Sequence, residues 1–134
     1  MSKLRLEIDD SSDIGFVDNY HVPGVISLNE FKKWIYFVIE NHDDIPSYFF
    51  KILDLNHKFE YNCLRIMGFA PKWEYNDASL DALVGIGFKR GAITTNDNLT
   101  REEALRALER NPHIEKKFYE MFPFLKEKDG VTDL

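Results

Sequence analysis

The sequence has few of the features that mark secreted or membrane-spanning proteins. Its single cysteine, Cys63, cannot form an internal disulfide. Its longest uninterrupted apolar run, from Trp34 to Ile39, is far shorter than the ~20 residues of a spanning helix. The charged segment that follows Met1 does not contain the apolar run of a signal peptide. We therefore expect a cytoplasmic protein that does not insert into a membrane.

Positive charge is also scarce. The 134 residues include 17 Lys and Arg against 23 Asp and Glu, which gives a net charge of −6 at pH 7. Such a surface repels a phosphate backbone, so we expect no direct contact with nucleic acid. The acidity is concentrated in residues 1–60, which hold 11 acidic and 6 basic side chains, whereas residues 61–134 hold 12 and 11. A negative surface is therefore expected from the N-terminal half.

What the chain does contain is enough apolar material for one core. Hydrophobic residues make up 44% of the sequence and aromatic residues 14%, and large rings bury much area for few residues. The length lies in the usual range of a single domain. We expect one domain over residues 1–134, with an irregular entry segment at 1–25, a helical core at 26–125 and a frayed tail at 126–134.

Two capping boxes are the strongest structural signals. They read Ser27-Leu28-Asn29-Glu30 and Thr100-Arg101-Glu102-Glu103. In each, the hydroxyl can accept from the amide three residues later, while the glutamate reaches back to the first amide. Each box precedes an apolar stripe of helical period. The pattern predicts helices over about 28–41 and 101–110.

Proline, asparagine and glycine positions predict the remaining helices. These lie near 45–55, from about 59 to 68, from 76 or 77 to 91, and from 112 to the residue before Pro123. For the segment from 59 to 68, a strand is the alternative. The helix predicted to end at 91 contains Gly85 and Gly87. These glycines require either close approach of another helix or a break, and we favour close packing.

The fold class follows from these elements. The alternation of Leu4, Leu6 and Ile8 with charged residues is typical of a short half-buried strand, although no clear partner strand is present in the sequence. The sequence therefore predicts a mainly α protein, a single-domain bundle of five to six short helices, with a short N-terminal β-strand as an optional addition.

The sequence contains no recognisable catalytic, cofactor or metal motif. The run from Asp9 to Asp13 does not match the ligand register of a calcium loop, and the Gly85-x-Gly87 pair has no third glycine at the dinucleotide-binding spacing. Cys63 lies on an apolar stripe, where a thiol is inert. The histidines are too far apart to pair on one helical face: His21, His42, His57 and His113. We expect no enzyme, no cofactor, no metal and no small-molecule substrate, with an unfamiliar active site as a remaining alternative.

Three segments of the chain resemble small helical bacterial immunity proteins, which are encoded beside contact-dependent or other polymorphic toxins. They read SLNEFKKW at 27–34, DALVGIG at 81–87 and TREEAL at 100–105. The resemblance implies a helical fold that binds one cognate toxin domain, often a basic nuclease, and blocks its active site. These families share no functional motif, so the resemblance assigns no residue a role.

The acidic and aromatic residues supply the expected interface. Complementary charge steers a basic partner, and aromatic side chains anchor it. We hypothesise an immunity protein that neutralises a cognate toxin domain by occluding its active site. The alternative is a non-enzymatic adaptor or phage-derived interaction protein that binds a partner helix. The candidate partner-binding residues are Asp9, Asp10, Asp13, Asp18, Tyr20, Asp43, Asp44, Tyr48, Trp73 and Tyr75.

Overall fold

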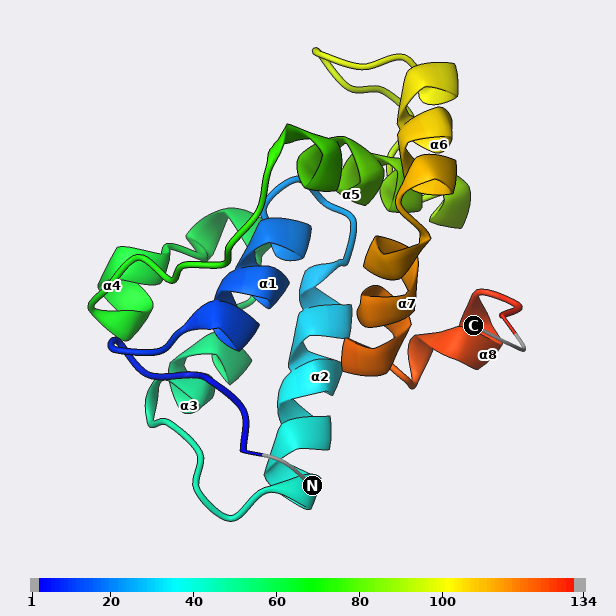
Figure 1. Cartoon of the computed structure of the whole chain (residues 1–134). Helices are drawn as coiled ribbons and strands as arrows, with labels where there is room; N and C mark the ends of the chain where they lie inside the picture. Colours follow the sequence, from blue (N-terminus) through cyan, green and yellow to red (C-terminus); the bar gives the residue numbers. More distant parts are fainter. Residues whose placement is uncertain (1–2, 132–134) are drawn as a thin grey trace. The chain divides into compact units, whose positions relative to one another are not determined.

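The computed structural model describes residues 3–131 and confirms the mainly helical fold class (Figure 1). The described residues form eight α-helices and one short 3-10 helix, so the predicted number of five to six helices is wrong. Within this part of the chain there is no sheet, only one isolated β-bridge between Glu7 and Asp10. The elements are α1 (Ser12–His21), α2 (Leu28–Asn41), α3 (Tyr48–Leu53), η1 (Lys58–Glu60), α4 (Cys63–Met67), α5 (Asp77–Arg90), α6 (Arg101–Arg110), α7 (Pro112–Met121) and α8 (Leu125–Lys128).

The chain divides into two compact units. Unit 1 comprises Met1–Val22 and Ile26–Glu74, and unit 2 comprises Pro23–Val25 and Tyr75–Leu134. The prediction of one domain over residues 1–134 stays a prediction. In the segment expected to fray, 126–134, α8 occupies the first residues, while 132–134 lie outside the described residues.

Unit 1 is built around α2, which begins at the predicted capping box. The Ser27 hydroxyl accepts from the Glu30 amide at 3.1 Å, and the Glu30 carboxylate accepts from the Ser27 amide at 2.9 Å. The inward stripe of α2 is completely buried and includes Phe31, Trp34 and Ile35. α2 packs against α1 and α3. The helix predicted over 28–41 is therefore confirmed with its bounds.

α1 lies in the segment predicted to be irregular, so that prediction is wrong for residues 12–21. The amides of Asp13 and Ile14 donate to the Arg5 carbonyl at 3.1 and 3.3 Å, and the Asp13 carboxylate accepts from the Arg5 amide at 2.7 Å. Free amides in the first turn of a helix need partners, and here residues before the helix supply them. The acidic run therefore starts a helix.

The N-terminal alternation of apolar residues does not produce a strand. Among the described residues 3–131, the only ladder bonds join Glu7 and Asp10, at 3.0 and 3.2 Å, and close a tight turn. Leu6 is buried, and its carbonyl accepts from the Tyr48 hydroxyl at 2.7 Å. Ile8 stays 66% exposed. The segment is thus fixed by α1, through Arg5, and by α3, through Tyr48, rather than by a partner strand.

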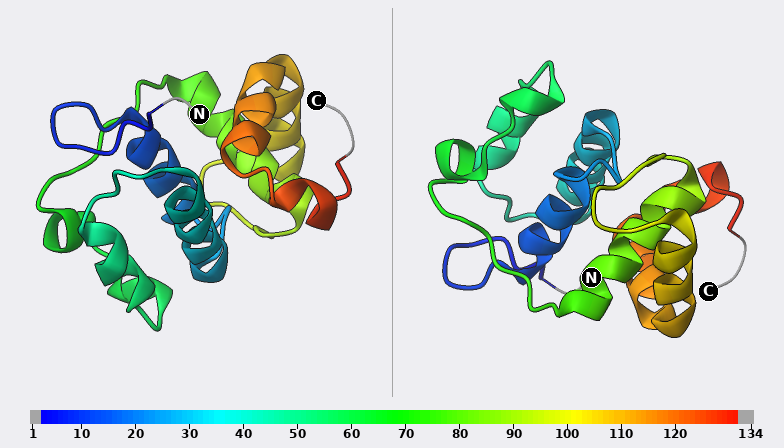
Figure 2. Two further views of the ribbon diagram at one scale, coloured as in Figure 1. Left: turned by 90° about the horizontal axis from the view of Figure 1, so that it is seen from below. Right: turned by 90° about the horizontal axis from the view of Figure 1, so that it is seen from above.

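Unit 2 is organised by the close packing of α5 on α6, which lie side by side in both views of Figure 2. A Cβ atom added to Gly85 would lie 2.4 Å from the carbonyl oxygen of Ala104 and 3.0 Å from the Cβ of Leu108. α5 runs without a break through both glycines. Close packing against another helix, the interpretation favoured from the sequence, is therefore confirmed for Gly85, whereas the close neighbours of Gly87 are Ile93 and Val25, which lie outside the helices.

The end of α8 is joined to the rest of unit 2 by a buried ion pair. The Arg90 Nε donates to the Asp129 Oδ2 at 2.7 Å, and the two side chains are 4% and 8% exposed. The Tyr119 hydroxyl donates to the same oxygen at 2.7 Å, and the Arg90 guanidinium lies 5.5 Å from the Phe118 ring centre. One carboxylate thus connects α5, α7 and the residue after α8.

Candidate functional site

The N-terminal segment and residues 41–44 of unit 1 line the same hollow. The Tyr48–Leu6 hydrogen bond holds the N-terminal segment beside the residues that precede α3. A hollow of about 330 Å³ between them is lined by Leu4 and Leu6 on one side and by 41–44 on the other. We define the acidic surface as the exposed acids of these two segments: Glu7, Asp9, Asp10, Asp43 and Asp44.

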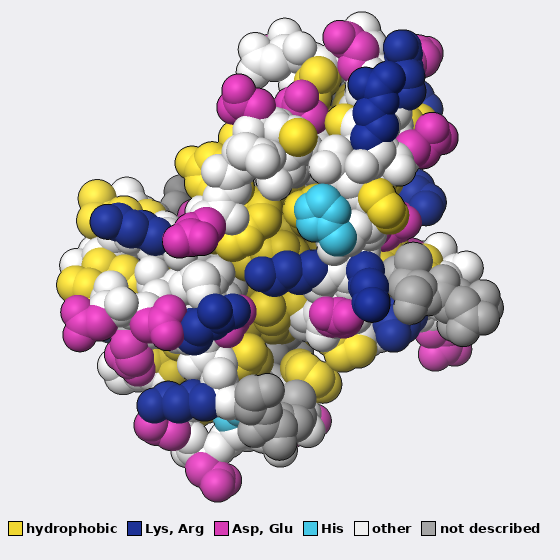
Figure 3. Space-filling view, viewed as in Figure 1, with side chains coloured by type: hydrophobic (Ala, Val, Ile, Leu, Met, Phe, Trp, Pro, Cys, Tyr) yellow, Lys and Arg dark blue, Asp and Glu magenta, His cyan; other side chains and the backbone are white. Residues whose placement is uncertain are grey.

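Basic side chains interrupt this surface only in part. Lys3 lines the same hollow as Asp43 and Asp44. The Arg5 guanidinium is bonded to the Asp13 carboxylate, with its Nη2 3.3 Å from Oδ1. In the space-filling view, acidic side chains gather around the N-terminal segment of unit 1, with Lys and Arg side chains among them (Figure 3). The surface is negative on balance.

Four of the predicted partner-binding residues are buried. Asp13 is 5% exposed, Tyr20 is fully buried, and Tyr48 and Trp73 are 6% and 7% exposed. Trp73 contacts the Phe16 ring edge-on at 5.1 Å. Aromatic residues serve cores as readily as interfaces, and composition does not distinguish the two uses. Burial therefore removes these four side chains from the surface that a partner would meet.

Asp18 is also withdrawn from the acidic surface. Its carboxylate accepts from the Tyr61 hydroxyl at 2.5 Å. Burial raises the pKa of Asp18, and the hydrogen bond from Tyr61 opposes this with a smaller effect. Of the predicted aromatic residues only Tyr75 stays exposed, at 53%, and it belongs to unit 2. From the predicted set, Asp43 and Asp44 line the hollow, and Asp9 and Asp10 stay exposed in the turn of the N-terminal segment.

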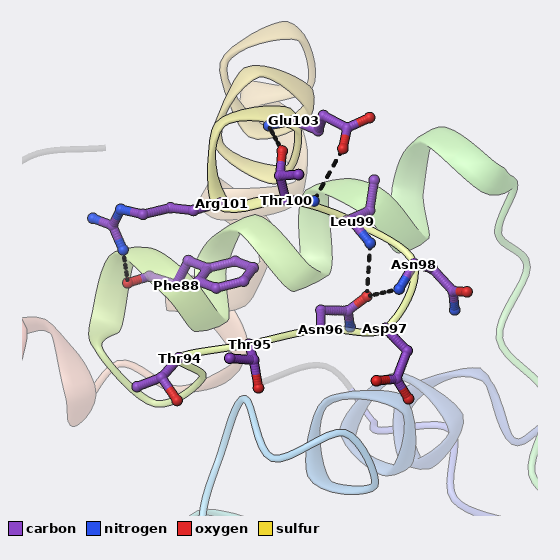
Figure 4. Close-up of a pocket in the computed structure, with 10 residues that line it drawn as sticks. All are labelled: Phe88, Thr94, Thr95, Asn96, Asp97, Asn98, Leu99, Thr100, Arg101 and Glu103. Carbon is purple, nitrogen blue, oxygen red and sulfur yellow. Dashed lines mark hydrogen bonds between the residues drawn. The ribbon is translucent and has the colours of Figure 1, made fainter.

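Unit 2 contains a polar pocket of about 360 Å³ between the end of α5 and the start of α6 (Figure 4). The side chains that line it form hydrogen bonds mainly with the backbone of the same loop and of the adjoining helix ends. The Asn96 Oδ1 accepts from the amides of Asn98 and Leu99 at 2.9 and 3.1 Å, and Thr100 and Glu103 form the second predicted capping box. Arg101 donates to the Phe88 carbonyl at 3.3 Å. These groups shape the loop and do not converge on a shared point.

Unit 1 also contains a pocket that the sequence did not predict, separate from the hollow beside Asp43 and Asp44. It has a volume of about 300 Å³ and lies where α1 ends beside η1. We call it the His21 pocket, and its lining residues are His21, Val22, Lys58, Phe59 and Tyr61. The sequence holds one signal for it: Phe59 is an aromatic residue among charged neighbours, and the structure leaves it 85% exposed.

We also searched residues 3–131 for a metal site, a reactive thiol and a membrane-spanning helix. No three His, Cys, Asp or Glu side chains of this range are disposed to hold a metal ion. Cys63 is half-buried rather than fully buried, and burial raises the pKa of its thiol with a further contribution from the Asp18 charge. No helix in this range has the length and apolar character needed to cross a membrane.

Comparison of the chain with protein-family models, with curated proteins and with solved structures finds no match. The fold is all-α, and the acidic surface and the pockets are the features from which a function can be inferred.

Proposed function

We propose that the protein is an immunity protein that binds a basic bacterial toxin domain through its acidic surface and thereby occludes the toxin's active site. The observation that supports this most is that Asp43 and Asp44 line one hollow of unit 1 together with the N-terminal segment, which carries Glu7, Asp9 and Asp10 as exposed side chains. Potentials of opposite sign across an interface raise association rates and disfavour wrong partners.

Charge alone does not hold such a complex, because exposed ion pairs are screened over about 8 Å at physiological salt. Ile8 supplies an apolar anchor. It is 66% exposed and lies between Glu7 and Asp9. The two backbone bonds between Glu7 and Asp10 fix the turn that presents it. A rigid apolar contact inside a charged rim has the anatomy of a protein interface.

The first test is affinity capture of the tagged protein from native host lysate at low and high salt. The proposal expects one basic toxin domain, released as salt rises, and protection of cells that express that toxin together with this protein. Failure of the protein to protect such cells would sink the immunity function.

Matched variants then test the surface. Asp9→Lys with Asp10→Lys should slow association about tenfold and leave dissociation nearly unchanged, because steering acts on the encounter. Ile8→Ala should mainly speed dissociation. Glu109→Lys with Glu120→Lys makes the same net charge change on exposed residues of unit 2 and is the control. Equal slowing in both double variants would show that net charge, and not the acidic surface, directs association.

A further inference from the structure

The His21 pocket has apolar walls that are open to solvent. Val22 and Phe59 are 59% and 85% exposed, although both are large apolar residues. One face of Phe59 stacks on the His57 ring, with ring centres 5.1 Å apart and an interplanar angle of 6°. The Tyr61 ring meets His21 edge-on at 4.9 Å. An apolar group placed here would remove both exposed side chains from water, which is favourable.

The pocket also carries a positive charge without a counter-ion. Lys58 lines it and has no ion-pair partner among residues 3–131. The Lys58 charge acts on the His21 ring, while the Tyr61 hydroxyl of the same pocket is already bonded to Asp18. A cation at the mouth of an apolar pocket selects a ligand whose polar end is an anion.

His21 adds a buried polar ring beside the pocket, with both ring nitrogens shielded from solvent. Its side chain is 1% exposed, and neither ring nitrogen has a hydrogen-bond partner within the described residues. Burial, together with the Lys58 charge, lowers the pKa of His21 to about 4. The ring is therefore neutral at pH 7 and holds one N–H donor and one acceptor. A buried polar ring without partners is uncommon, because leaving such groups unbonded is costly.

We propose that the His21 pocket binds a small monocarboxylic acid that carries one aromatic ring or one branched alkyl group. The apolar group lies against Val22, Phe59 and Tyr61, and the carboxylate pairs with the Lys58 ammonium. The volume of about 300 Å³ is at the lower end of the range for ligand pockets, so the occupant has one ring rather than several.

Phenylacetate and its neutral isostere phenylacetamide test this proposal. Each is titrated into the whole protein at pH 7 while NMR follows the backbone amides and the His21 imidazole. We expect saturable shifts at Val22, Lys58, Phe59 and His21 with phenylacetate, and a dissociation constant on the order of 1 mM for a ligand of about ten non-hydrogen atoms. Phenylacetamide should bind up to about fivefold more weakly, because it lacks the charge that pairs with the exposed Lys58 ammonium.

Lys58→Gln should remove the preference for the acid and leave binding of the amide unchanged. Lys51→Gln is the matched control, since Lys51 is an exposed lysine of unit 1 that does not line the pocket. Equal binding of acid and amide, shifts outside the pocket, no saturable shift, or equal weakening by the two variants would each overturn the proposal. No toxin takes part in the titration, so its outcome is independent of the proposed immunity function.

Discussion

Gly85 is the position where one added methyl group tests the packing of α5 on α6 most directly. In Gly85→Ala the new Cβ would meet the Ala104 carbonyl oxygen at 2.4 Å and the Leu108 Cβ at 3.0 Å. Comfortable contacts between carbon atoms lie near 3.5–4.0 Å. Neither atom belongs to the free end of a flexible side chain. The two helices must therefore move apart along the contact to admit the methyl group.

The expected cost combines two opposing effects. Overpacking of a well-packed core costs up to ~3 kcal/mol, and replacing glycine by alanine inside a helix returns ~1 kcal/mol. Because the clash is with backbone, we place Gly85→Ala at the upper end, and expect the free energy of unfolding to fall by about 2 kcal/mol. The measurement is urea unfolding followed by circular dichroism, with the midpoint and slope fitted together.

Gly87→Ala is the internal comparison, because it makes the same chemical change in the same helix. There the closest atoms are the Cδ1 and Cγ1 of Ile93, at 2.4 and 2.8 Å, which belong to a side chain that can rotate. The loss of stability should be clearly smaller than for Gly85→Ala. If Gly85→Ala is as stable as the parent, or if Gly87→Ala loses more, the reasoning from backbone contact is refuted.

Two further predictions concern buried charge. Asp129→Asn should lower the free energy of unfolding by about 3–5 kcal/mol, because it removes the charge of the carboxylate that the buried Arg90 Nε and the Tyr119 hydroxyl both bond. Urea unfolding at pH 7 checks this, and a loss under ~1 kcal/mol contradicts it. The pKa of His21 lies near 4 in the folded protein, below its unfolded value of about 6.5. The stability that neutral His21 provides is therefore complete above pH ~6.5 and is lost as pH falls toward 4, by up to about 3 kcal/mol. The free energies of unfolding of the parent and of His21→Leu should therefore depend differently on pH over this window. Asp18, whose raised pKa changes stability in the opposite sense, is present in both proteins, so its contribution cancels in the comparison. An NMR titration of His21 with a midpoint above pH 6 would contradict the prediction.

The helix starts could be predicted because their causes are local. Both capping boxes involve residues three apart, and the structure forms them with the expected donors and acceptors. Asn76 likewise accepts from the Ser79 amide, as predicted for the start of α5, and α7 begins at Pro112. Gly91 ends α5 with a φ of 75°, a conformation that glycine adopts without strain.

The predictions are wrong where a hydrogen-bond partner distant in sequence determines the local structure or the burial of a side chain. α1 depends on the Arg5 carbonyl and on the Ser11 hydroxyl, which accepts from the Lys72 amide at 2.9 Å. Nothing in the sequence around 9–13 indicates that such partners exist, so the sequence predicts an irregular segment there. The same holds for Tyr48, whose burial depends on the Leu6 carbonyl. Local patterns predict where helices begin, but not which rings and acids the tertiary structure encloses.

The acidic residues of the run 9–13 differ in burial and therefore in their contribution to the surface charge. Asp9 and Asp10 lie in the turn and stay exposed, whereas Asp13 faces inward from α1 and is 5% exposed. Its carboxylate bonds both the amide and the guanidinium of Arg5, and these contacts raise the pKa of Arg5. Arg5 is thus neutralised by a buried partner rather than by the acids of the turn. If the acidic surface steers a basic partner, Asp13 contributes without touching that partner, because Asp13→Asn would return a positive charge beside Asp9 and Asp10 and weaken the field they produce.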